Sequence, residues 1–436
     1  MSSARYYAVK LLGRTFSGGG YSNILLDSAL SEWDMEQRDK AFCTSLYYGV
    51  LERRITLDHI ISGYSKAKLS KLHPDVLNIL RIGIYQLKYM DGVPESAAIN
   101  ESVKLAKKMR LQRLSGFVNA VLRSFQRDGF EIKYPDKNPQ KMSVMYSSPV
   151  WLVNKLIREY GESAAVSLLK SSCEKPPVTV RLNTLKGSDD NIFREMEELE
   201  PQVCSMPKHC AVLGNAADVT RSEAFKKGMF HVQDIASQLC CMALSPNEGE
   251  TVLDMCSAPG GKAFTMAQLM NGKGSIYAFD LHESRVRLIQ KGAQRLGLSN
   301  IIAECGDASK HAEGIPLADK ILCDVPCSGL GVIRRKPEIK YKAPEEFEKL
   351  PEIQYGILEN AASYLKIGGE LVYSTCTLNR AENDEVIERF LENHNDYKGI
   401  SFLEDLGEPF GDYRATLVPE YFGSDGFFIS KLRRIG

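Results

Sequence analysis

The chain has 436 residues, 44% of them hydrophobic and 25% charged, which is ordinary for a globular protein of two or three domains. It contains no long apolar run and no apolar signal core near its N-terminus, so we expect a cytoplasmic protein without a membrane span. Lys plus Arg and Asp plus Glu both total 55. The 11 cysteines include no C-x-x-C pair, which argues against a disulfide framework and against a zinc site.

Residues 1–130 are predicted to form an all-helical bundle. Apolar residues recur there at helical spacing, as at Leu77, Leu80, Ile84 and Leu87. Breaks between helices are predicted at Gly18–Gly20, before Pro74 and at Asp91–Pro94. The first 135 residues carry 20 Lys and Arg against 13 Asp and Glu, a net charge of +7. This excess suits contact with nucleic acid and an ordinary solvated helical surface about equally well.

Residues 140–225 are predicted to hold a linker and a small α+β insert. A helix is expected over about 150–171, followed by a strand at Val178–Leu182 and a helix over about 188–200.

Residues 226–436 show a different sequence pattern, in which short apolar runs alternate with helical stretches. Strands are predicted at 251–255, 275–280, 300–304, 320–324 and 369–374, with helices at 262–270 and 284–296. This alternation predicts a doubly wound α/β domain with a parallel sheet. The end of the chain, 416–432, is predicted to form a β-hairpin with Asp425-Gly426 near its turn.

The first predicted strand of this domain ends in a turn of small residues, Cys256-Ser-Ala-Pro-Gly-Gly-Lys262. Ligands of open α/β sheets bind beyond the carboxyl ends of the strands, and Gly260 and Gly261 allow a ligand close to the backbone. Asp280 ends the second strand and Asp307 follows the third, where carboxylates could meet a ribose and an adenine amine. A tight turn without a ligand, and acids that cap helices, are the alternatives. The recurrence of acids at successive strand ends favours a nucleoside cofactor.

Two cysteines, Cys327 and Cys376, each follow a predicted strand of the same domain. A thiol at such a strand end can act as a nucleophile. Addition of a thiolate to C6 of a pyrimidine activates C5 toward an electrophilic methyl group. A second group must then remove the C5 proton so that the thiol can leave. Either cysteine taken alone is more often a small buried hydrophobe.

Three segments resemble the RNA (cytosine-5)-methyltransferases that use S-adenosylmethionine: Leu253–Lys262, Asp324–Gly331 and Tyr373–Thr377. Asp425–Phe428 resembles the C-terminal signature of that family, and Gly228–Gln238 resembles the segment before its catalytic core.

The N-terminal block resembles the NusB-type RNA-binding bundle, on Arg38–Phe42, Tyr48–Leu51, Ala98–Glu101 and Gly116–Arg123. The order of bundle, insert and core is similar to the bacterial RsmB (Sun/Fmu) type, which methylates 16S ribosomal RNA at cytosine 967. The resemblance implies a NusB-like bundle, an RRM-like α+β insert, and a Rossmann-like class I methyltransferase core with an antiparallel last strand.

By this resemblance Cys376 is the nucleophile that attacks C6, and Cys327 assists release of the methylated product. Asp324 and Lys262 would contact or polarise the target base. The residues implied to line the S-adenosylmethionine site are Cys256, Ser257, Ala258, Pro259, Gly260, Gly261, Lys262, Asp280, Asp307 and Asp324.

The implied partner is 16S ribosomal RNA, and we expect a monomer with no DNA partner. Arg181, Arg334, Arg335 and Lys336 are candidates for RNA contacts, with a solvated surface as the alternative for each. Two other functions stay open: the same chemistry on tRNA or another rRNA position, and a non-catalytic NusB-like RNA-binding factor. A DNA cytosine-5 enzyme would carry its nucleophile on the Pro-Cys motif and would leave the helical block unexplained.

Overall fold

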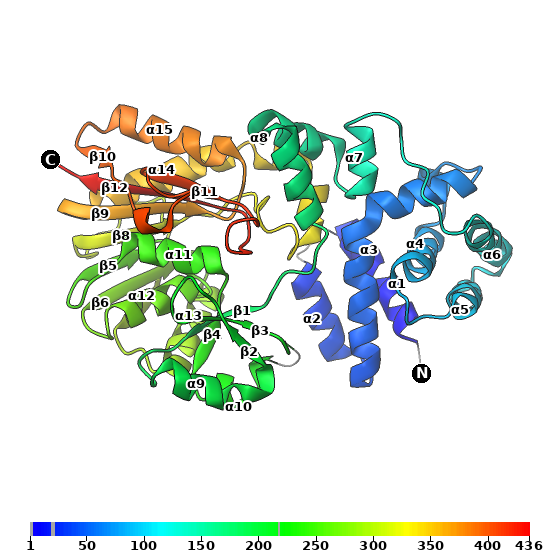
Figure 1. Ribbon diagram of the computed structural model, residues 1–436, viewed down its shortest axis with the longest axis horizontal. Coiled ribbons are helices and arrows are strands. Elements are labelled where there is room, and N and C mark those ends of the chain that lie inside the picture. The colour runs from blue at the N-terminus through cyan, green and yellow to red at the C-terminus, as the bar shows by residue number, and fades with distance from the viewer. Residues whose placement is uncertain (1–2, 19–21, 217–218) are drawn as a thin grey trace. The chain divides into compact units, whose positions relative to one another are not determined.

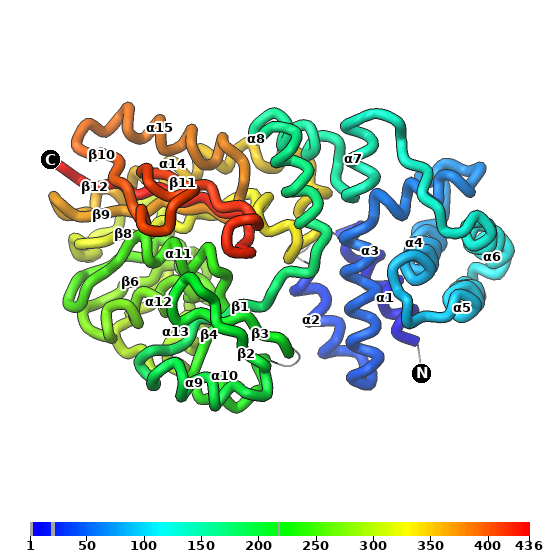
Figure 2. Tube along the Cα trace, viewed as in Figure 1, coloured from blue at the N-terminus to red at the C-terminus, as the bar shows by residue number. Residues whose placement is uncertain are grey.

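The computed structural model describes residues 3–18, 22–216 and 219–436 (Figure 1, Figure 2). The chain divides into two compact units. The helical unit comprises Met1–Lys175 and Ile333–Lys342, and the sheet unit comprises Pro176–Val332 and Ala343–Gly436. Among the described residues no helix has the length and apolar character that a membrane crossing requires.

The helical unit confirms the predicted bundle. Its helices are α1 (Ala4–Gly18), α2 (Ser22–Glu32), α3 (Gln37–Tyr64), α4 (Pro74–Tyr89), α5 (Glu95–Lys108), α6 (Gln112–Arg127), α7 (Gln140–Met145) and α8 (Val150–Ser171). Helix α4 starts where the sequence predicts, because Pro74 occupies its first turn and the His73 ring accepts the Asp75 N–H. Helix α1 ends at Gly18, whereas Gly19 and Gly20 of the predicted break lie outside the described residues.

The segment Ile333–Lys342 also belongs to the helical unit, although the residues on both sides of it belong to the sheet unit. It contains a short 3-10 helix, η4 (Pro337–Tyr341), which lies against α3. No pattern in the sequence predicted this excursion.

The first part of the sheet unit is the predicted small α+β insert. Its sheet has the antiparallel order β2-β3-β1-β4. The strands are β1 (Thr179–Leu182), β2 (Pro201–Val203), β3 (Cys210–Leu213) and β4 (Phe230–Val232), with helices α9 (Asp189–Glu195) and α10 (Glu223–Lys226). A core that includes Val180, Leu182, Ile192 and Phe230 fills the space between sheet and helices.

The large sheet has the order β10-β12-β9-β8-β5-β6-β7, and β11 pairs with β12. Strands β5 to β9 run parallel, whereas β10, β11 and β9 all pair antiparallel with β12, so the expected antiparallel last strand is confirmed. The strands are β5 (Thr251–Asp254), β6 (Ser275–Asp280), β7 (Ile301–Cys305), β8 (Ala318–Asp324), β9 (Leu365–Thr375), β10 (Tyr397–Gly399), β11 (Arg414–Leu417) and β12 (Phe427–Arg434).

Helices cover both faces of this sheet (Figure 1). Helices α11 (Ile235–Leu244), α12 (Gly261–Leu269) and α13 (Glu283–Leu296) lie on one face, and α14 (Leu350–Ser363) and α15 (Asp384–Asn393) lie on the other. The alternation along β6 shows why: Ile276 and Ala278 join the first core, whereas Tyr277 and Phe279 join the second. The predicted doubly wound α/β domain is therefore confirmed.

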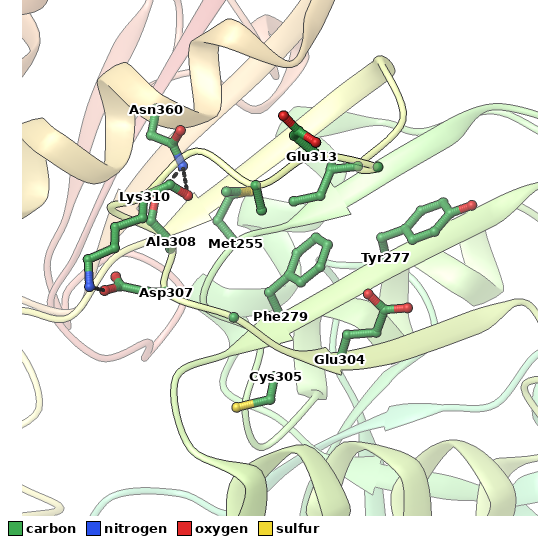
Figure 3. Close-up of a pocket in the computed structure, with 14 residues that line it drawn as sticks. Met255, Tyr277, Phe279, Glu304, Cys305, Asp307, Ala308, Lys310, Glu313 and Asn360 are labelled. Carbon is green, nitrogen blue, oxygen red and sulfur yellow. Dashed lines mark hydrogen bonds and ion pairs between the residues drawn. The ribbon is translucent and has the colours of Figure 1, made fainter.

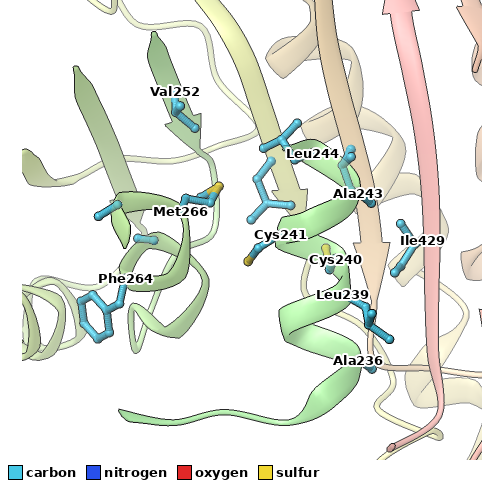
Figure 4. Close-up of a cluster of buried hydrophobic side chains, with 14 of the residues drawn as sticks. Ala236, Leu239, Cys240, Cys241, Ala243, Leu244, Val252, Phe264, Met266 and Ile429 are labelled. Carbon is cyan, nitrogen blue, oxygen red and sulfur yellow. The ribbon is translucent and has the colours of Figure 1, made fainter. Parts of the chain in front are cut away.

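Helix α11 is buried along nearly its whole length. Figure 4 shows its side chains packed among the strands, with Cys240 and Leu239 near Ile429 of β12. Cys240 and Cys241 are fully buried, and burial raises the pKa of both thiols. These two cysteines are core residues.

Candidate active site

Four acidic residues mark the carboxyl edge of the parallel strands. The strand order β8-β5-β6-β7 places them along that edge in the order Asp324, Asp254, Asp280 and Asp307. Asp280 and Asp307 are close, because Gly306 donates its N–H to the Asp280 carbonyl at 3.0 Å. Residues predicted from separate motifs thus come together at the edge where α/β sheets bind ligands.

The turn Cys256–Lys262 joins β5 to α12 and carries all the turn residues predicted to line the cofactor. It is pinned to β6 by the Ser257 N–H, which donates to the Phe279 carbonyl at 2.7 Å. Gly260 has φ = 106°, and a Cβ there would lie 2.5 Å from the Phe264 ring. Only glycine fits this position, and α12 begins immediately after it with its free N–H groups at the site.

Asp254, at the end of β5, was not among the predicted site residues. Its side chain is fully buried, and neither carboxylate oxygen has a hydrogen-bond partner among the described residues. Burial raises the pKa of this carboxyl to about 7. The neighbouring Ser257 hydroxyl is also buried without a partner. An unpaired buried carboxylate fits a cationic ligand group, and S-adenosylmethionine carries both an ammonium and a sulfonium.

Asp280 and Asp307 each hold the turn that follows their strand. Asp280 accepts the His282 N–H at 3.0 Å, and Asp307 accepts the Ser309 N–H at 3.1 Å and the Ser309 hydroxyl at 2.7 Å. The bonds from Ser309, followed by that from Lys310, lower the pKa of Asp307 to about 2. Both acids therefore cap turns, and both also offer oxygens at the ligand edge.

A cavity of about 230 Å³ opens beside Asp307. Figure 3 shows Met255 and Phe279 between Asp307 on one side and Glu304 on the other. Asn360 of α14 closes the cavity by donating to the backbone carbonyls of Ala308 and Lys310. Apolar and aromatic walls with acids at the rim suit a nucleoside that carries amino and hydroxyl donors.

The two predicted reacting cysteines face each other, with 3.3 Å between the sulfur atoms of Cys327 and Cys376. Both side chains are thiols and are partly buried. The hydrogen bond to Cys376, together with burial, raises the pKa of the Cys327 thiol well above its usual value.

Lys262 and Asp324 form an ion pair beside the thiols, with Nζ and Oδ2 2.7 Å apart. Ser374 donates its hydroxyl to the other oxygen of Asp324 at 2.9 Å. Burial alone would lower the pKa of Lys262, but Asp324 and the neighbouring thiols of Cys240 and Cys241 together raise the pKa above its usual value. Lys262 therefore stays protonated in the site.

A second buried acid, Glu382, connects the two cysteine loops, and it was not predicted from the sequence. Its carboxylate accepts the Ser328 N–H at 2.8 Å and hydroxyl at 2.5 Å, the Gln354 amide at 2.9 Å and the Asn379 amide at 2.7 Å. Ser328 follows Cys327, and its hydroxyl lies 2.7 Å from that of Thr377, which follows Cys376. The network fixes the positions of both thiols.

The Asp425–Phe428 signature is explained by a close approach of three backbones. Gly331 donates its N–H to the Cys376 carbonyl at 3.0 Å, and its own carbonyl accepts the Gly426 N–H at 3.0 Å. A Cβ on Gly426 would lie 2.7 Å from the Gly331 Cα. Both glycines are needed for the Pro-Cys loop to reach β9 and β12.

The predicted RNA contacts are corrected in part. Arg181 is 2% exposed and donates to the Lys208 carbonyl at 2.8 Å inside the insert, so the prediction of an RNA-contacting Arg181 is wrong. Arg334 is 8% exposed, which contradicts the same prediction there. Arg335 and Lys336 are half-buried within Ile333–Lys342. Sequence alone placed these cations on a surface because the burial of their segments was not visible.

Comparison with known families agrees with this arrangement. The 16S rRNA methyltransferase RsmB/F family matches residues 241–433, the NusB family matches residues 2–127, and the RsmF/B-like ferredoxin-like domain matches residues 148–220. "Probable ribosomal RNA small subunit methyltransferase B" of Bacillus subtilis is 39% identical over 446 residues, which cover 100% of this chain and 99% of that protein. The chain belongs to the RsmB/F methyltransferase family.

Other relatives extend this result. "Ribosomal RNA small subunit methyltransferase B" of Photorhabdus laumondii is 32% identical, covering 92% of both chains. Among solved structures, a methyltransferase homologue from Pyrococcus horikoshii is 30% identical with a TM-score of 0.59, covering 67% of this chain and 97% of its own. The structure of PH0851 is 24% identical with a TM-score of 0.81 over 100% of this chain and 99% of its own, and it supports the fold. The protein is an S-adenosylmethionine-dependent methyltransferase.

Proposed function

We propose that this methyltransferase acts on 16S ribosomal RNA and transfers the methyl group to C5 of a cytosine, cytosine 967, through a covalent adduct at C6. The small-subunit rRNA methyltransferases among its relatives support the substrate class. The observation that carries the chemistry is the pair of thiols 3.3 Å apart, next to the Lys262–Asp324 ion pair.

Cys376 is the nucleophile in this proposal. Its thiolate adds to C6, and the electron pair of the C5–C6 double bond becomes available at C5. S-Adenosylmethionine supplies the electrophilic methyl group when it is bound. Loss of the C5 proton then lets the C6–sulfur bond break and restores the aromatic ring. Cys327, whose sulfur lies 3.3 Å from that of Cys376, is proposed for the second role: in its thiolate form it accepts the C5 proton and so assists the release of product from Cys376.

Lys262 and Asp324 orient and polarise the target base. The protonated amine can donate to an oxygen or ring nitrogen of cytosine, and the carboxylate can accept from its exocyclic amine. Asp324 is itself held by Ser374, which immediately precedes Thr375 and Cys376. The base-holding pair and the nucleophile are thus fixed to the same strand end.

The turn Cys256–Lys262 with Asp280, Asp307 and Asp324 is proposed to hold the cofactor, and we add Asp254 to this set. In the proposed division of the chain, residues 1–130 and the insert within 140–225 bind RNA, and residues 226–436 carry out methyl transfer. The target base has to leave its stack to reach the thiols.

The test is methyl transfer from labelled S-adenosylmethionine to protein-free 16S rRNA, with mapping of the modified base. We expect one 5-methylcytosine, at position 967. Transfer to tRNA or 23S rRNA instead would keep the chemistry and overturn the substrate, and no transfer to any RNA would favour a non-catalytic RNA-binding factor.

Two cysteine variants separate the proposed roles. Cys376→Ala should lose all transfer while it still binds cofactor. Cys327→Ala should form the C6 adduct but release it slowly, so a protein–RNA complex stable in denaturing gels should accumulate. The reverse pattern, with the trapped complex in Cys376→Ala, would move the nucleophile to Cys327.

A further inference from the structure

The excursion Ile333–Lys342, which we call the strap, is firmly held within the helical unit. The Glu338 carboxylate accepts the Ser22 N–H at 2.9 Å and the Ser22 hydroxyl at 2.8 Å, at the N-terminus of α2. The Lys340 amine donates to the Glu52 carbonyl at 2.8 Å, and the Tyr341 hydroxyl donates to the Leu51 carbonyl at 2.6 Å. These anchors tie the strap to two helices.

Burial shows that the strap is no ordinary surface loop. Lys340 is 1% exposed, and burial lowers the pKa of its amine to about 8. The Tyr341 ring lies 4.9 Å from the Arg54 guanidinium, and Ile339 is 4% exposed. Lysine is rarely buried in this way, because the ammonium loses its hydration.

The strap begins almost at the reacting thiols. Gly331 is fixed by its hydrogen bonds to Cys376 and Gly426, and the strap starts at Ile333. Only Val332 lies between them, and each residue of extended chain spans at most about 3.5 Å. A shift of the strap therefore reaches Gly331, whose N–H is bonded to the carbonyl of the proposed nucleophile.

The far end of the strap returns to the same loops. The chain leaves the strap at Lys342 and enters α14 at Leu350. In the second turn of α14, Gln354 donates both to the Pro326 carbonyl and to Glu382. Pro326 immediately precedes Cys327. The chain is thus bonded to the cysteine loops at Gly331, two residues before the strap, and at Gln354, twelve residues after it.

We propose that the strap is a positioning element for methyl transfer: the helical unit, through Glu338, Lys340 and Tyr341, holds the Cys327 loop in register with Cys376. The helical unit then contributes to the chemical step as well as to any RNA binding. This inference rests on the proposed roles of the two cysteines.

The test uses the full-length protein with the variants Tyr341→Phe and Glu338→Ala. Each variant removes anchoring hydrogen bonds of the strap. Neither variant substitutes a residue of the proposed active site. We expect the single-turnover rate at saturating RNA and cofactor to fall about 10-fold or more, since small misplacements of reacting groups are costly. The dissociation constants for RNA and cofactor should stay within about twofold, because the proposed ligand contacts remain.

Two matched variants make the result specific. Glu338→Gln keeps one acceptor oxygen for Ser22 and should recover most of the rate. Thr56→Val removes a hydrogen bond of the same kind, from the Thr56 hydroxyl to the Val144 carbonyl at 2.6 Å, elsewhere in the helical unit. It should transfer methyl at the wild-type rate, and thermal unfolding identifies any variant that fails to fold.

The geometry of the thiols gives a second readout. A diazenedicarboxamide oxidant removes the hydrogens of two adjacent thiols and joins the sulfurs, and peptide mapping reports how fast Cys327 bonds to Cys376. This rate should fall in Tyr341→Phe and Glu338→Ala if the strap sets the separation of the sulfurs.

Wild-type single-turnover rates in folded strap variants would overturn the proposal. An equal loss in Thr56→Val, or a loss of RNA affinity with an unchanged rate at saturation, would also overturn it. The proposed function fails separately, if the wild-type protein itself forms no 5-methylcytosine.

Discussion

Two regions of the sheet unit each contain a fully buried carboxylate, and the two carboxylates differ in the hydrogen bonds that they accept. Behind the cysteine loops, Glu382 accepts four hydrogen bonds. At the proposed cofactor edge, Asp254 accepts none among the described residues. A satisfied buried charge fixes its surroundings, whereas an unsatisfied one costs stability until a ligand compensates it. The first region is therefore rigid, and the second is the one proposed to bind the cofactor.

The largest expected effect comes from Glu382→Ala. The variant leaves the Ser328, Gln354 and Asn379 donors without their acceptor in the interior, so it should lower the free energy of unfolding by about 3–5 kcal/mol. Urea denaturation measures this loss. Glu345→Ala, at an exposed position, serves as the control and should change the free energy by less than about 0.5 kcal/mol. A small loss in Glu382→Ala would show that the network does not hold the loops.

Gly331→Ala tests the same rigid region through the backbone. The added Cβ would overlap the Gly426 carbonyl, and main-chain atoms cannot swing away as a side chain can. We expect a loss of about 2–3 kcal/mol in the free energy of unfolding. Gly356→Ala is the matched control, because a Cβ there meets no atom within 4 Å. It should be neutral or slightly stabilising, since alanine favours α14.

Asp254→Asn tests the binding region, and its effect depends on pH. The folded-state pKa is about 7 and lies above the unfolded value of about 3.9, so the folded wild type loses stability as the pH rises from about 4 through 7. The asparagine variant lacks this loss and should be more stable than the wild type by about 2 kcal/mol at pH 8, but not at pH 4. Urea denaturation at the two pH values checks the prediction.

The same variant should bind S-adenosylmethionine at least about 10-fold more weakly at pH 8, because it lacks the compensating charge. Equilibrium dialysis with labelled cofactor measures this. A variant that gained stability and kept full affinity would show that Asp254 does not face the cofactor.

The difference between the regions also explains what could be predicted from the sequence. Strand periodicity and the turn Cys256–Lys262 are local signals, and they located β5 to β9 and the loop that joins β5 to α12. Glu382 was not predicted because its partners Ser328 and Gln354 lie 54 and 28 residues away in the sequence. Asp254 was not predicted as a site residue because only the three-dimensional structure shows that its carboxylate lacks hydrogen-bond partners.

The errors have a similar cause. From the sequence, Arg181 was predicted to be a surface cation. Every residue of β1 is buried, however, so the usual alternation of buried and exposed residues along a strand does not apply. Arg334 lies in the strap, whose burial depends on helices about 280 to 320 residues earlier in the chain. The family resemblance supplied the proposed roles of the cysteines, but it could not supply these long-range contacts.

Asp307→Asn should give the smallest change in the free energy of unfolding. It tests whether Asp307 belongs with Asp254 or with the region around Glu382. The low pKa of Asp307 comes from Ser309 and Lys310 in its own exposed turn, so the folding contribution of this charge is screened by water. We expect a change of less than about 0.5 kcal/mol in the free energy of unfolding, measured beside Asp254→Asn. Cofactor affinity should nevertheless fall, because asparagine offers one acceptor oxygen where the carboxylate offers two. An acid that is dispensable for folding and needed for the ligand would place Asp307 with Asp254 in the binding region. If the free energy of unfolding fell strongly while the affinity for the cofactor stayed unchanged, Asp307 would stabilise its turn and would not contact the cofactor.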